Sequence, residues 1–266
     1  EGTRLTPAAV GLAASIGAAT LEVHRRPRVA CFFTGDELVM PGQPLPAGGI
    51  YNSNRFVLNA LLRRLGCEVL DLGIVPDSRE ATRQALREAA EGADLIISAG
   101  GVSVGEEDHV RPAVEAEGQI DLWRVAIKPG RPLAYGRVGR HGPEGARAAV
   151  PGSFAHFIGL PGNPVSAYVT FLLFVRPFVL RLQGIQAVEP QAVTLISSFD
   201  WTNPDRRREF LRAVHLPDGR LGLFRQQGSA VLTSAVVGHG LIDNPPGQAI
   251  RQGDAVRFLS FAELLN

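Results

Sequence analysis

This chain has few cysteines, and its histidines lack the spacings of common metal sites. Its 266 residues include two cysteines, Cys31 and Cys67, and no CxxC pair. Both cysteines lie in apolar, strand-like runs, which indicates buried thiols in a reducing compartment and excludes a disulfide framework. The six histidines show neither HExxH nor HxxxH spacing, so a zinc site of that kind is not expected.

The chain also has almost no net charge, with 27 Lys+Arg against 26 Asp+Glu and a formal net charge of +1. This balance gives no reason to expect nucleic acid or an anionic membrane as a partner, although a local anion site in a cleft is compatible with it. The most hydrophobic stretch, residues 165–180, is too short to span a bilayer and contains Arg176-Pro177, so we expect a buried core helix. No basic-then-apolar leader follows Glu1, and we expect a cytoplasmic protein.

The chain divides into three regions with different predicted secondary structure. Residues 6–16 predict a short helix and residues 19–23 a strand, before a basic link at 24–28. From Arg28 to Gly184 strands alternate with helices, which favours an α/β fold with a mostly parallel sheet sandwiched by helices. After Gly184, short strand-like runs and turns predict a small all-β domain without a helix of any length. In the α/β region the predicted strands are 28–33, 67–75, 93–101, 120–127, 132–138 and 156–160, and the predicted helices are 53–66, 77–92, 107–117 and 163–184.

A glycine-rich loop, SAGGVSVGEED at 98–108, is the most informative stretch. It follows a predicted strand and precedes a predicted helix, and ligands of parallel sheets bind at the carboxyl ends of the strands. Gly100, Gly101 and Gly105 would let the backbone approach a ligand closely and present N–H groups to an anion. The loop is neither GxGxxG nor a Walker A sequence. The alternative interpretation is a tight strand-to-helix turn without a ligand.

Acidic residues follow three successive predicted strands. Asp108 comes just after the glycines, and a carboxylate beside a phosphate loop suits a hard cation such as Mg²⁺. Asp36 and Glu37 follow the first strand and would lie at the same sheet edge if the first and third strands are neighbours. Asp77 follows the second strand, with the alternative that it is simply a helix N-cap. Carboxylates gathered in this way could hold Mg²⁺ or perturb one another's pKa.

Two turns carry further candidates for anion binding. In AIKPGRPLAYG (126–136), Lys128 and Arg131 flank Pro129-Gly130, and fixed cations on a rigid turn suit an oxyanion. The alternative is an exposed hairpin. In LPGNPVSAYVTF (160–171), Asn163 is a candidate N-cap before Pro164, so the helix N-terminus could bind an anion or could merely be capped.

The predicted β domain contains two further motifs. The arginine run in RRREFLR (206–212) is interpreted as a solvated strand face. In QQGSAVLTS (226–234), Gly228-Ser229 could supply a hydroxyl and backbone N–H groups or could form a plain turn.

Seven motifs occur in the order seen in the molybdopterin molybdenumtransferase family, the MoeA-like proteins that include the gephyrin E domain. They are TGDELV, IYNSN, GIVPDS, AGGVSVGEEDH, AIKPGRPLAYG, LPGNPVSAYVTF and QQGS. The chain resembles this family over nearly its whole length from Gly2. The resemblance implies a molybdopterin-binding α/β domain at 27–184 and a C-terminal β domain at 185–266. Residues 1–26 then resemble the tail of a further N-terminal domain, as expected for a fragment that begins without Met.

The activity that the resemblance implies is insertion of molybdate into adenylylated molybdopterin with release of AMP, with Mg²⁺ at the phosphates. Glu37, Asp77 and Asp108 match the family's functional acids, with Glu37 and Asp108 as metal ligands, and Lys128 matches its essential lysine. Arg124 and Arg131 stand where relatives commonly have lysine, and Lys128, Arg212 and Ser229 match cleft positions that would hold molybdate. The implied binding positions are Gly100, Gly101, Ser103, Gly105, Arg124, Pro129, Asn163, Arg212 and Ser229.

The resemblance also implies a homodimer and, as a further partner, the molybdopterin adenylyltransferase. Two other functions are compatible with the sequence. One is that of a molybdopterin adenylyltransferase itself, which would use ATP and release pyrophosphate, although such proteins carry GGTG-type sequence where this chain has GGVSVGEED. The other is that of a non-catalytic scaffold of the same fold, and retention of the acidic residues argues against it.

Overall fold

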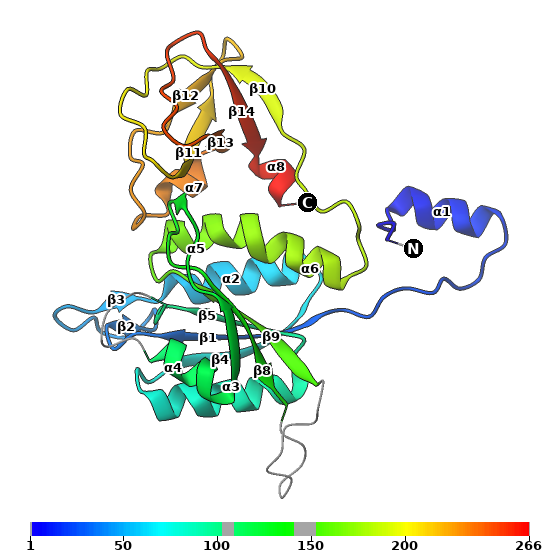
Figure 1. Ribbon diagram of the computed structural model, residues 1–266. Helices are drawn as coiled ribbons and strands as arrows, with labels where there is room; N and C mark the ends of the chain where they lie inside the picture. Colours follow the sequence, from blue (N-terminus) through cyan, green and yellow to red (C-terminus); the bar gives the residue numbers. More distant parts are fainter. Residues whose placement is uncertain (1, 103–108, 141–152, 266) are drawn as a thin grey trace, which may run out of the picture.

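The computed structural model describes residues 2–102, 109–140 and 153–265. It consists of an N-terminal arm, an α/β module and a small β module (Figure 1). The arm contains α1 (Pro7–Ser15), which begins as predicted with the Thr6 side chain accepting a hydrogen bond from the Ala9 amide. None of the α1 residues is buried. The strand predicted at 19–23 is absent, because this segment runs beside no other strand.

The α/β module is built on a six-stranded sheet with the order β4-β1-β5-β9-β8-β6. β4, β1, β5 and β9 are parallel, β8 runs antiparallel to β9, and β6 runs antiparallel to β8 and so in the direction of the first four, which confirms the prediction of a mostly parallel sheet. The strand predicted at 120–127 is wrong in its second half, because the chain leaves this sheet after Leu122. The strands are β1 (Arg28–Thr34), β4 (Glu68–Val75), β5 (Leu95–Ala99), β6 (Gly118–Leu122), β8 (Ala134–Gly139) and β9 (Phe154–Leu160).

Helices cover both faces of this sheet (Figure 1). α3 (Arg79–Gly92) and α4 (Val110–Glu117) pack on one face, and α2 (Ser53–Arg64) packs on the other beside a long apolar helix. Side chains of β1 alternate between the two cores, as expected for a strand buried on both faces. Cys31 and Cys67 are free and buried, which raises the pKa of both thiols.

The long helix runs from Pro164 to Leu182 as α5 (Pro164–Thr170), a π-turn and α6 (Arg176–Leu182). Its length and composition would allow it to cross a membrane, but 61% of its most apolar window is buried inside the protein. The prediction of a core helix is therefore confirmed. The π-turn ends just before Pro177, whose missing N–H removes one helical hydrogen bond at that point.

The β module contains a second sheet, with the order β10-β14-β13-β11-β12. Two short helices accompany it, although the sequence predicted none, because four or five residues are too few to show a helical period. The elements are β10 (Val193–Ile196), β11 (Arg208–His215), β12 (Leu221–Leu223), α7 (Thr233–Val237), β13 (Gly240–Asn244), β14 (Ala255–Ser260) and α8 (Phe261–Leu264).

A two-residue strand joins the modules. β7 (Ile127–Lys128) leaves the α/β module and pairs in parallel with β11, with Ile127 opposite Arg208 and Lys128 opposite Glu209. The apolar core continues across this junction, because buried residues of both modules belong to one cluster that includes Ile127, Phe171 and Phe210. The two modules thus share a core although they are separate along the chain.

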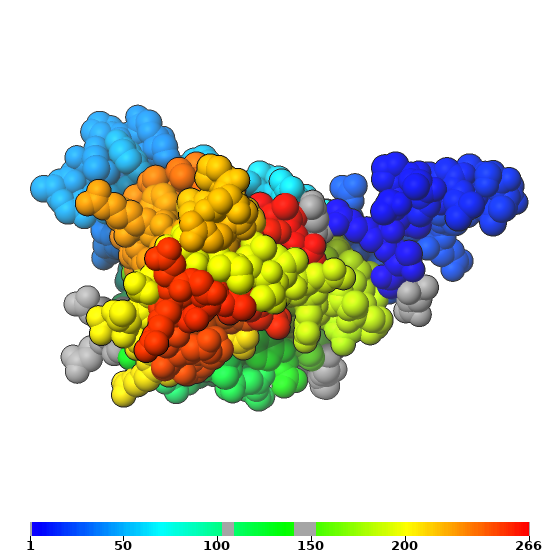
Figure 2. Space-filling view, turned by 90° about the horizontal axis from the view of Figure 1, so that it is seen from above, coloured from blue at the N-terminus to red at the C-terminus, as the bar shows by residue number. Residues whose placement is uncertain are grey.

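A small lobe projects from the α/β module. β2 (Leu38–Val39) and β3 (Ile50–Tyr51) form a two-stranded parallel sheet within it. In Figures 1 and 2 the lobe lies on the side of the molecule opposite to the N-terminal arm. It follows β1 directly, so it stands beside the edge at which the parallel strands end.

Glu117 gives a testable measure of helix packing. Burial by itself raises the pKa of this carboxyl, but hydrogen bonds from Arg87 and Arg83 outweigh it and lower the pKa to about 2. A depressed pKa stabilises the fold above the unfolded value of about 4.3, and this stabilisation is lost as pH falls through the folded value. We expect Glu117→Gln to lower the unfolding free energy at pH 7 by about 3 kcal/mol.

The difference between wild type and Glu117→Gln should shrink as pH falls from about 4.5 to about 2, measured by urea denaturation. Glu115→Gln is the matched control, because Glu115 forms an exposed pair with Arg111 on the same helix. It should change the unfolding free energy by less than about 0.5 kcal/mol. Equal effects of the two substitutions would contradict a stabilising role for the bonds from Arg83 and Arg87 to Glu117.

Candidate functional site

The strands of the first sheet end together at one edge, which we call the carboxyl edge. The registers place the ends of β1, β4, β5 and β9 side by side. Because β8 and β6 are antiparallel, β8 begins and β6 ends at this same edge, with Ala134 opposite Gly159 and Leu122 opposite Tyr135. The loops predicted to carry chemistry therefore open on one edge, where ligands of such sheets bind.

Gly100 and Gly101 follow β5 at the carboxyl edge with positive φ angles of 98° and 62°. A Cβ on Gly100 would lie 2.2 Å from the Thr34 carbonyl oxygen, and one on Gly101 would lie 2.5 Å from Val110 Cγ2. The Gly100 amide donates to the Leu160 carbonyl at 3.2 Å, so it is engaged within the protein. Both glycines are thus required by local packing. Ser103, Gly105 and Asp108 lie outside the described residues.

Two predicted acids lie on neighbouring strand ends. Asp77 is half-buried, and its Oδ1 accepts a hydrogen bond of 3.1 Å from the Thr34 hydroxyl. Thr34 was not among the candidate site residues that the sequence motifs indicated. The alternative role of Asp77 as an N-cap is wrong, because Ser78 caps α3 through its bond from the Ala81 amide. The Glu37 carboxylate is exposed and folds back over Gly35.

These carboxylates fit a magnesium ion by the chemistry of their donors. Within residues 2–102, 109–140 and 153–265 there is no group of three acidic, histidine or cysteine side chains that could enclose a metal. Mg²⁺ does not need such a cage, because it keeps several waters and takes one or two carboxylates together with substrate phosphates. Glu37, which is exposed, and Asp77, which follows the neighbouring strand, suit that open coordination.

Two helix N-termini also face this edge. α2 begins at Asn52, whose Oδ1 accepts from the Arg55 amide, and Asn54 donates to the Gly162 carbonyl at 2.7 Å. Asn163 occupies the N-cap position of α5, but its side chain makes no capping hydrogen bond. The expected capping role of Asn163 is therefore wrong.

The α5 N-terminus is occupied by the β module. The Val165 amide donates to the Ser229 carbonyl at 2.9 Å. Arg212 is buried, 1% exposed, and its guanidinium donates to the Gly228 carbonyl at 2.8 Å. Burial lowers the pKa of Arg212 to about 10. Arg212 thus fixes the turn that carries Ser229 against the N-terminus of α5, where Asn163 is the N-cap residue, so the structure gathers these three predicted residues in one region.

Lys128 lies elsewhere. It is the only lysine of the chain, and its Nζ is 3.2 Å from Glu209 Oε1 and 3.5 Å from Asp205 Oδ2. Because Glu209 and Arg212 are three positions apart on β11, their side chains leave opposite faces of the sheet. The structure therefore does not bring Lys128 to Arg212. Pro129 is buried beside Gly130, which packs against Thr170 of α5.

A basic hollow opens beside Lys128, between segment 124–131 and segment 205–207, with a cavity volume of about 520 Å³. Four arginines and one aspartate line it, a net charge of +3, and hydrogen bonds from Arg207 lower the pKa of Asp205. β11 begins at Arg208, so Arg206 and Arg207 precede the strand face that the arginine run was expected to form, and Arg206 is exposed as expected. The lining residues are Arg124, Val125, Ala126, Arg131, Asp205, Arg206 and Arg207.

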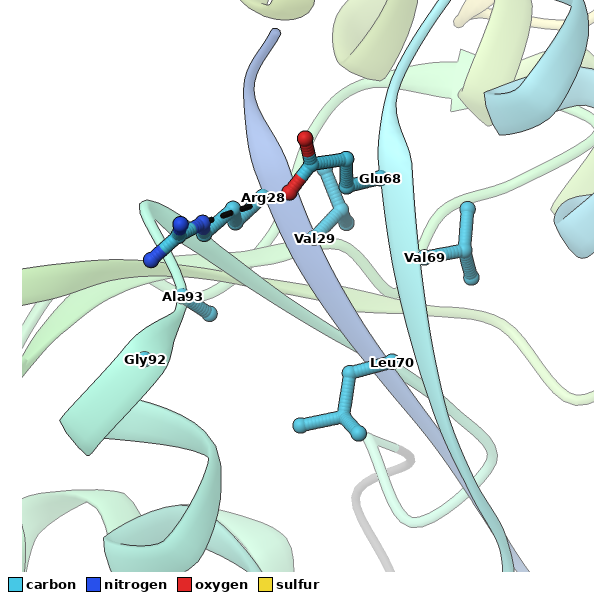
Figure 3. A pocket seen from close by; sticks show the side chains of 7 residues that line it. All are labelled: Arg28, Val29, Glu68, Val69, Leu70, Gly92 and Ala93. Carbon is cyan, nitrogen blue, oxygen red and sulfur yellow. Dashed lines mark hydrogen bonds and ion pairs between the residues drawn. The ribbon is translucent and has the colours of Figure 1, made fainter.

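A different hollow, at the opposite edge of the sheet, lacks such chemistry. Leu70 points from β4 toward the end of α3, and Arg28 pairs with Glu68 at the rim (Figure 3). This pair is exposed and accounts for both charged side chains that line the hollow. The carboxyl edge and the basic hollow therefore form the candidate site.

The packing role of Gly100 can be tested with alanine. Gly42 has nearly the same φ, 93°, but no atom within 4 Å of an added Cβ, so Gly42→Ala measures backbone strain alone. We expect Gly42→Ala to cost about 1 kcal/mol. Gly100→Ala should cost at least about 2 kcal/mol more, because its Cβ meets a main-chain oxygen. Urea denaturation measures both, and equal losses would contradict the packing argument.

Comparison with known proteins gives one consistent result. The family model described as "Probable molybdopterin binding domain" matches residues 30–181, and that of the "MoeA C-terminal region (domain IV)" matches 194–261. The chain is similar to the molybdopterin molybdenumtransferase of Haemophilus influenzae, with 41% identity over 216 residues, covering 81% of this chain and 50% of the relative. It is similar to that of Nostoc sp., with 36% identity over 231 residues, covering 85% and 50%.

The chain is also similar in structure to the molybdopterin biosynthesis MoeA protein from Pyrococcus horikosii. The TM-score is 0.79 at 26% identity, covering 98% of this chain and 61% of that one. The chain spans about half the length of the curated relatives it matches. Since one family model covers more than half of the residues and the second follows it in order, the chain belongs to the MoeA-like family of molybdopterin-binding proteins.

Proposed function

We propose that this chain forms the catalytic part of a molybdopterin molybdenumtransferase, which inserts molybdate into adenylylated molybdopterin and releases AMP. The observation that carries the proposal is the division of the carboxyl edge into two halves. One half has glycines and carboxylates suited to phosphate and Mg²⁺, at the ends of β1, β4 and β5. The other half has the basic hollow, which suits an oxyanion, beside β6 and β8.

The two halves are separated by a distance that fits a long substrate. β5 and β6 are three positions apart in the sheet, and neighbouring strands lie about 4.8 Å apart, so their axes are on the order of 14 Å apart. A molecule bound along the edge can therefore place a phosphate near Gly101 and its other end near Arg131. Adenylylated molybdopterin is extended in this way.

On the phosphate side, Mg²⁺ would be held by Glu37 and Asp108, Asp77 would position a water or the metal, and the ion when bound would polarise the scissile phosphate. Thr34 fixes one oxygen of Asp77 by its hydrogen bond and leaves the other oxygen available. The amide of Asn52 contributes further polarity, because its buried Nδ2 has no partner among the described residues. A polar ligand at this edge would satisfy that donor.

On the oxyanion side, Lys128, Arg124 and Arg131 would donate hydrogen bonds to molybdate. Charge-assisted bonds of this kind act on a dianion from several directions and hold it in place while the phosphate bond breaks. Arg212 has a different part, since its guanidinium is engaged with Gly228 and holds the turn of Ser229. The proposed activity takes place in the cytoplasm, with a homodimer as the assembly and the molybdopterin adenylyltransferase as the supplier of substrate.

The proposal is tested in the full-length protein by molybdate-dependent AMP release. Arg131→Ala and Lys128→Ala should each raise the molybdate concentration for half-maximal rate by about tenfold or more, because each removes a charge-assisted hydrogen bond. Arg251→Ala, at an exposed turn of the β module, is the control and should leave the rate unchanged. Normal molybdate dependence of both hollow variants would place the oxyanion elsewhere.

A further inference from the structure

We infer that Glu209 is the positioning residue of the oxyanion site: its buried carboxylate holds the Lys128 ammonium on one side and the backbone of Asp205 on the other. The inference rests on the proposed function, because it assigns a role within the same site. Glu209 was not singled out in the sequence, where it stands inside the RRREFLR motif.

The contacts of Glu209 divide between its two oxygens. The side chain is completely buried, and Oε1 accepts from Lys128 Nζ at 3.2 Å. Oε2 accepts from Trp201 Nε1 at 2.8 Å and from the Asp205 amide at 3.1 Å. A buried carboxylate is costly unless it is paired and hydrogen-bonded, and here both oxygens are engaged.

These contacts fix both sides of the basic hollow. Oε1 faces the α/β module, in which Lys128 continues through the turn to Arg131. Oε2 faces the β-module loop, in which Asp205 continues to Arg206 and Arg207. One carboxylate thus links side chain and backbone of two cationic segments that are far apart in the sequence, in addition to the pairing of β7 with β11. Removing it would release the Lys128 ammonium and the Asp205 amide from this link.

Lys128 needs such a partner more than an arginine would. Its ammonium stands on a flexible four-carbon chain and the side chain is 41% exposed, so nothing but its acceptors fixes its position. An ammonium has three N–H donors. Glu209 accepts a hydrogen bond from one of them and Asp205, which lines the hollow, lies 3.5 Å away as an ion-pair partner, so the ammonium keeps N–H donors for an oxyanion in the hollow.

The presence of a single lysine makes the test direct. A chain labelled with ¹³C and ¹⁵N in lysine alone gives one side-chain ammonium signal, and that signal reports on Lys128. Inorganic molybdate is the probe, with sulfate as a second tetrahedral dianion. Affinity is measured by calorimetry, and the lysine signal is followed during the titration.

Glu209→Gln is the informative substitution. The glutamine oxygen can still accept from Trp201 and the Asp205 amide, while its NH₂ group would face the Lys128 ammonium. We expect the lysine signal to shift, its ammonium protons to exchange faster with water, and the molybdate Kd to rise by about tenfold. Glu209→Asp keeps the charge but shortens the reach, and should give a smaller rise in Kd with the signal partly restored.

Asp243→Asn is the matched control, because Asp243 is another buried carboxylate of the same sheet, paired with Arg208 and Arg257 away from Lys128. It should leave the lysine signal in place and the molybdate Kd within about twofold, even if it destabilises the fold as much as Glu209→Gln. This separates positioning from a purely structural role.

Unchanged lysine signal and unchanged Kd in folded Glu209→Gln would overturn the inference. If Glu209→Gln does not fold, Glu209→Asp decides by the same two readouts. Failure of the proposed function gives another pattern: wild type would bind neither dianion at Lys128, while the lysine signal would still respond to Glu209→Gln. The two failures are therefore distinguishable.

Discussion

The short parallel pairing of β7 with β11 determines how the site is assembled. β7 contributes Ile127 and Lys128 to the sheet of the β module, opposite Arg208 and Glu209. This register puts an apolar residue into the shared core and a cation beside a buried acid. A shift by one residue would exchange the two faces, because side chains alternate along a strand. The position of the basic hollow therefore depends on this pairing.

The long helix explains why so short a strand can hold its register. α5 and α6 lie between the two sheets (Figure 1), and their apolar side chains pack on both modules. The turn after β7 rests on α5 through Gly130 and Thr170, and the Ser229 turn rests on the N-terminus of the same helix. The turn after β7 and the Ser229 turn of the β module are thus positioned by the same helix.

The sequence predicted the α/β architecture and the convergence of loops at one edge, because strand and helix periods are local properties. It predicted poorly the side-chain contacts that depend on strand register and on residues far apart in the chain. Asp77 looks like an N-cap in the sequence, but Ser78 takes that place and Thr34 binds Asp77 instead. Lys128 and Glu209 are 81 residues apart, and nothing local indicates their contact. The roles assigned to Glu37, Asp108 and the other site residues stay predictions.

The antiparallel pairing of β8 with β9 places the two ends of β8 at opposite edges of the sheet. The segment before β8 lies at the carboxyl edge, whereas the connection from Gly139 to Phe154 leaves and re-enters at the amino edge. The two described ends of that connection therefore lie at the edge of the module remote from the site. An affinity tag or a fluorescent label attached at Gly139 or Phe154 would therefore not crowd a substrate bound at the carboxyl edge.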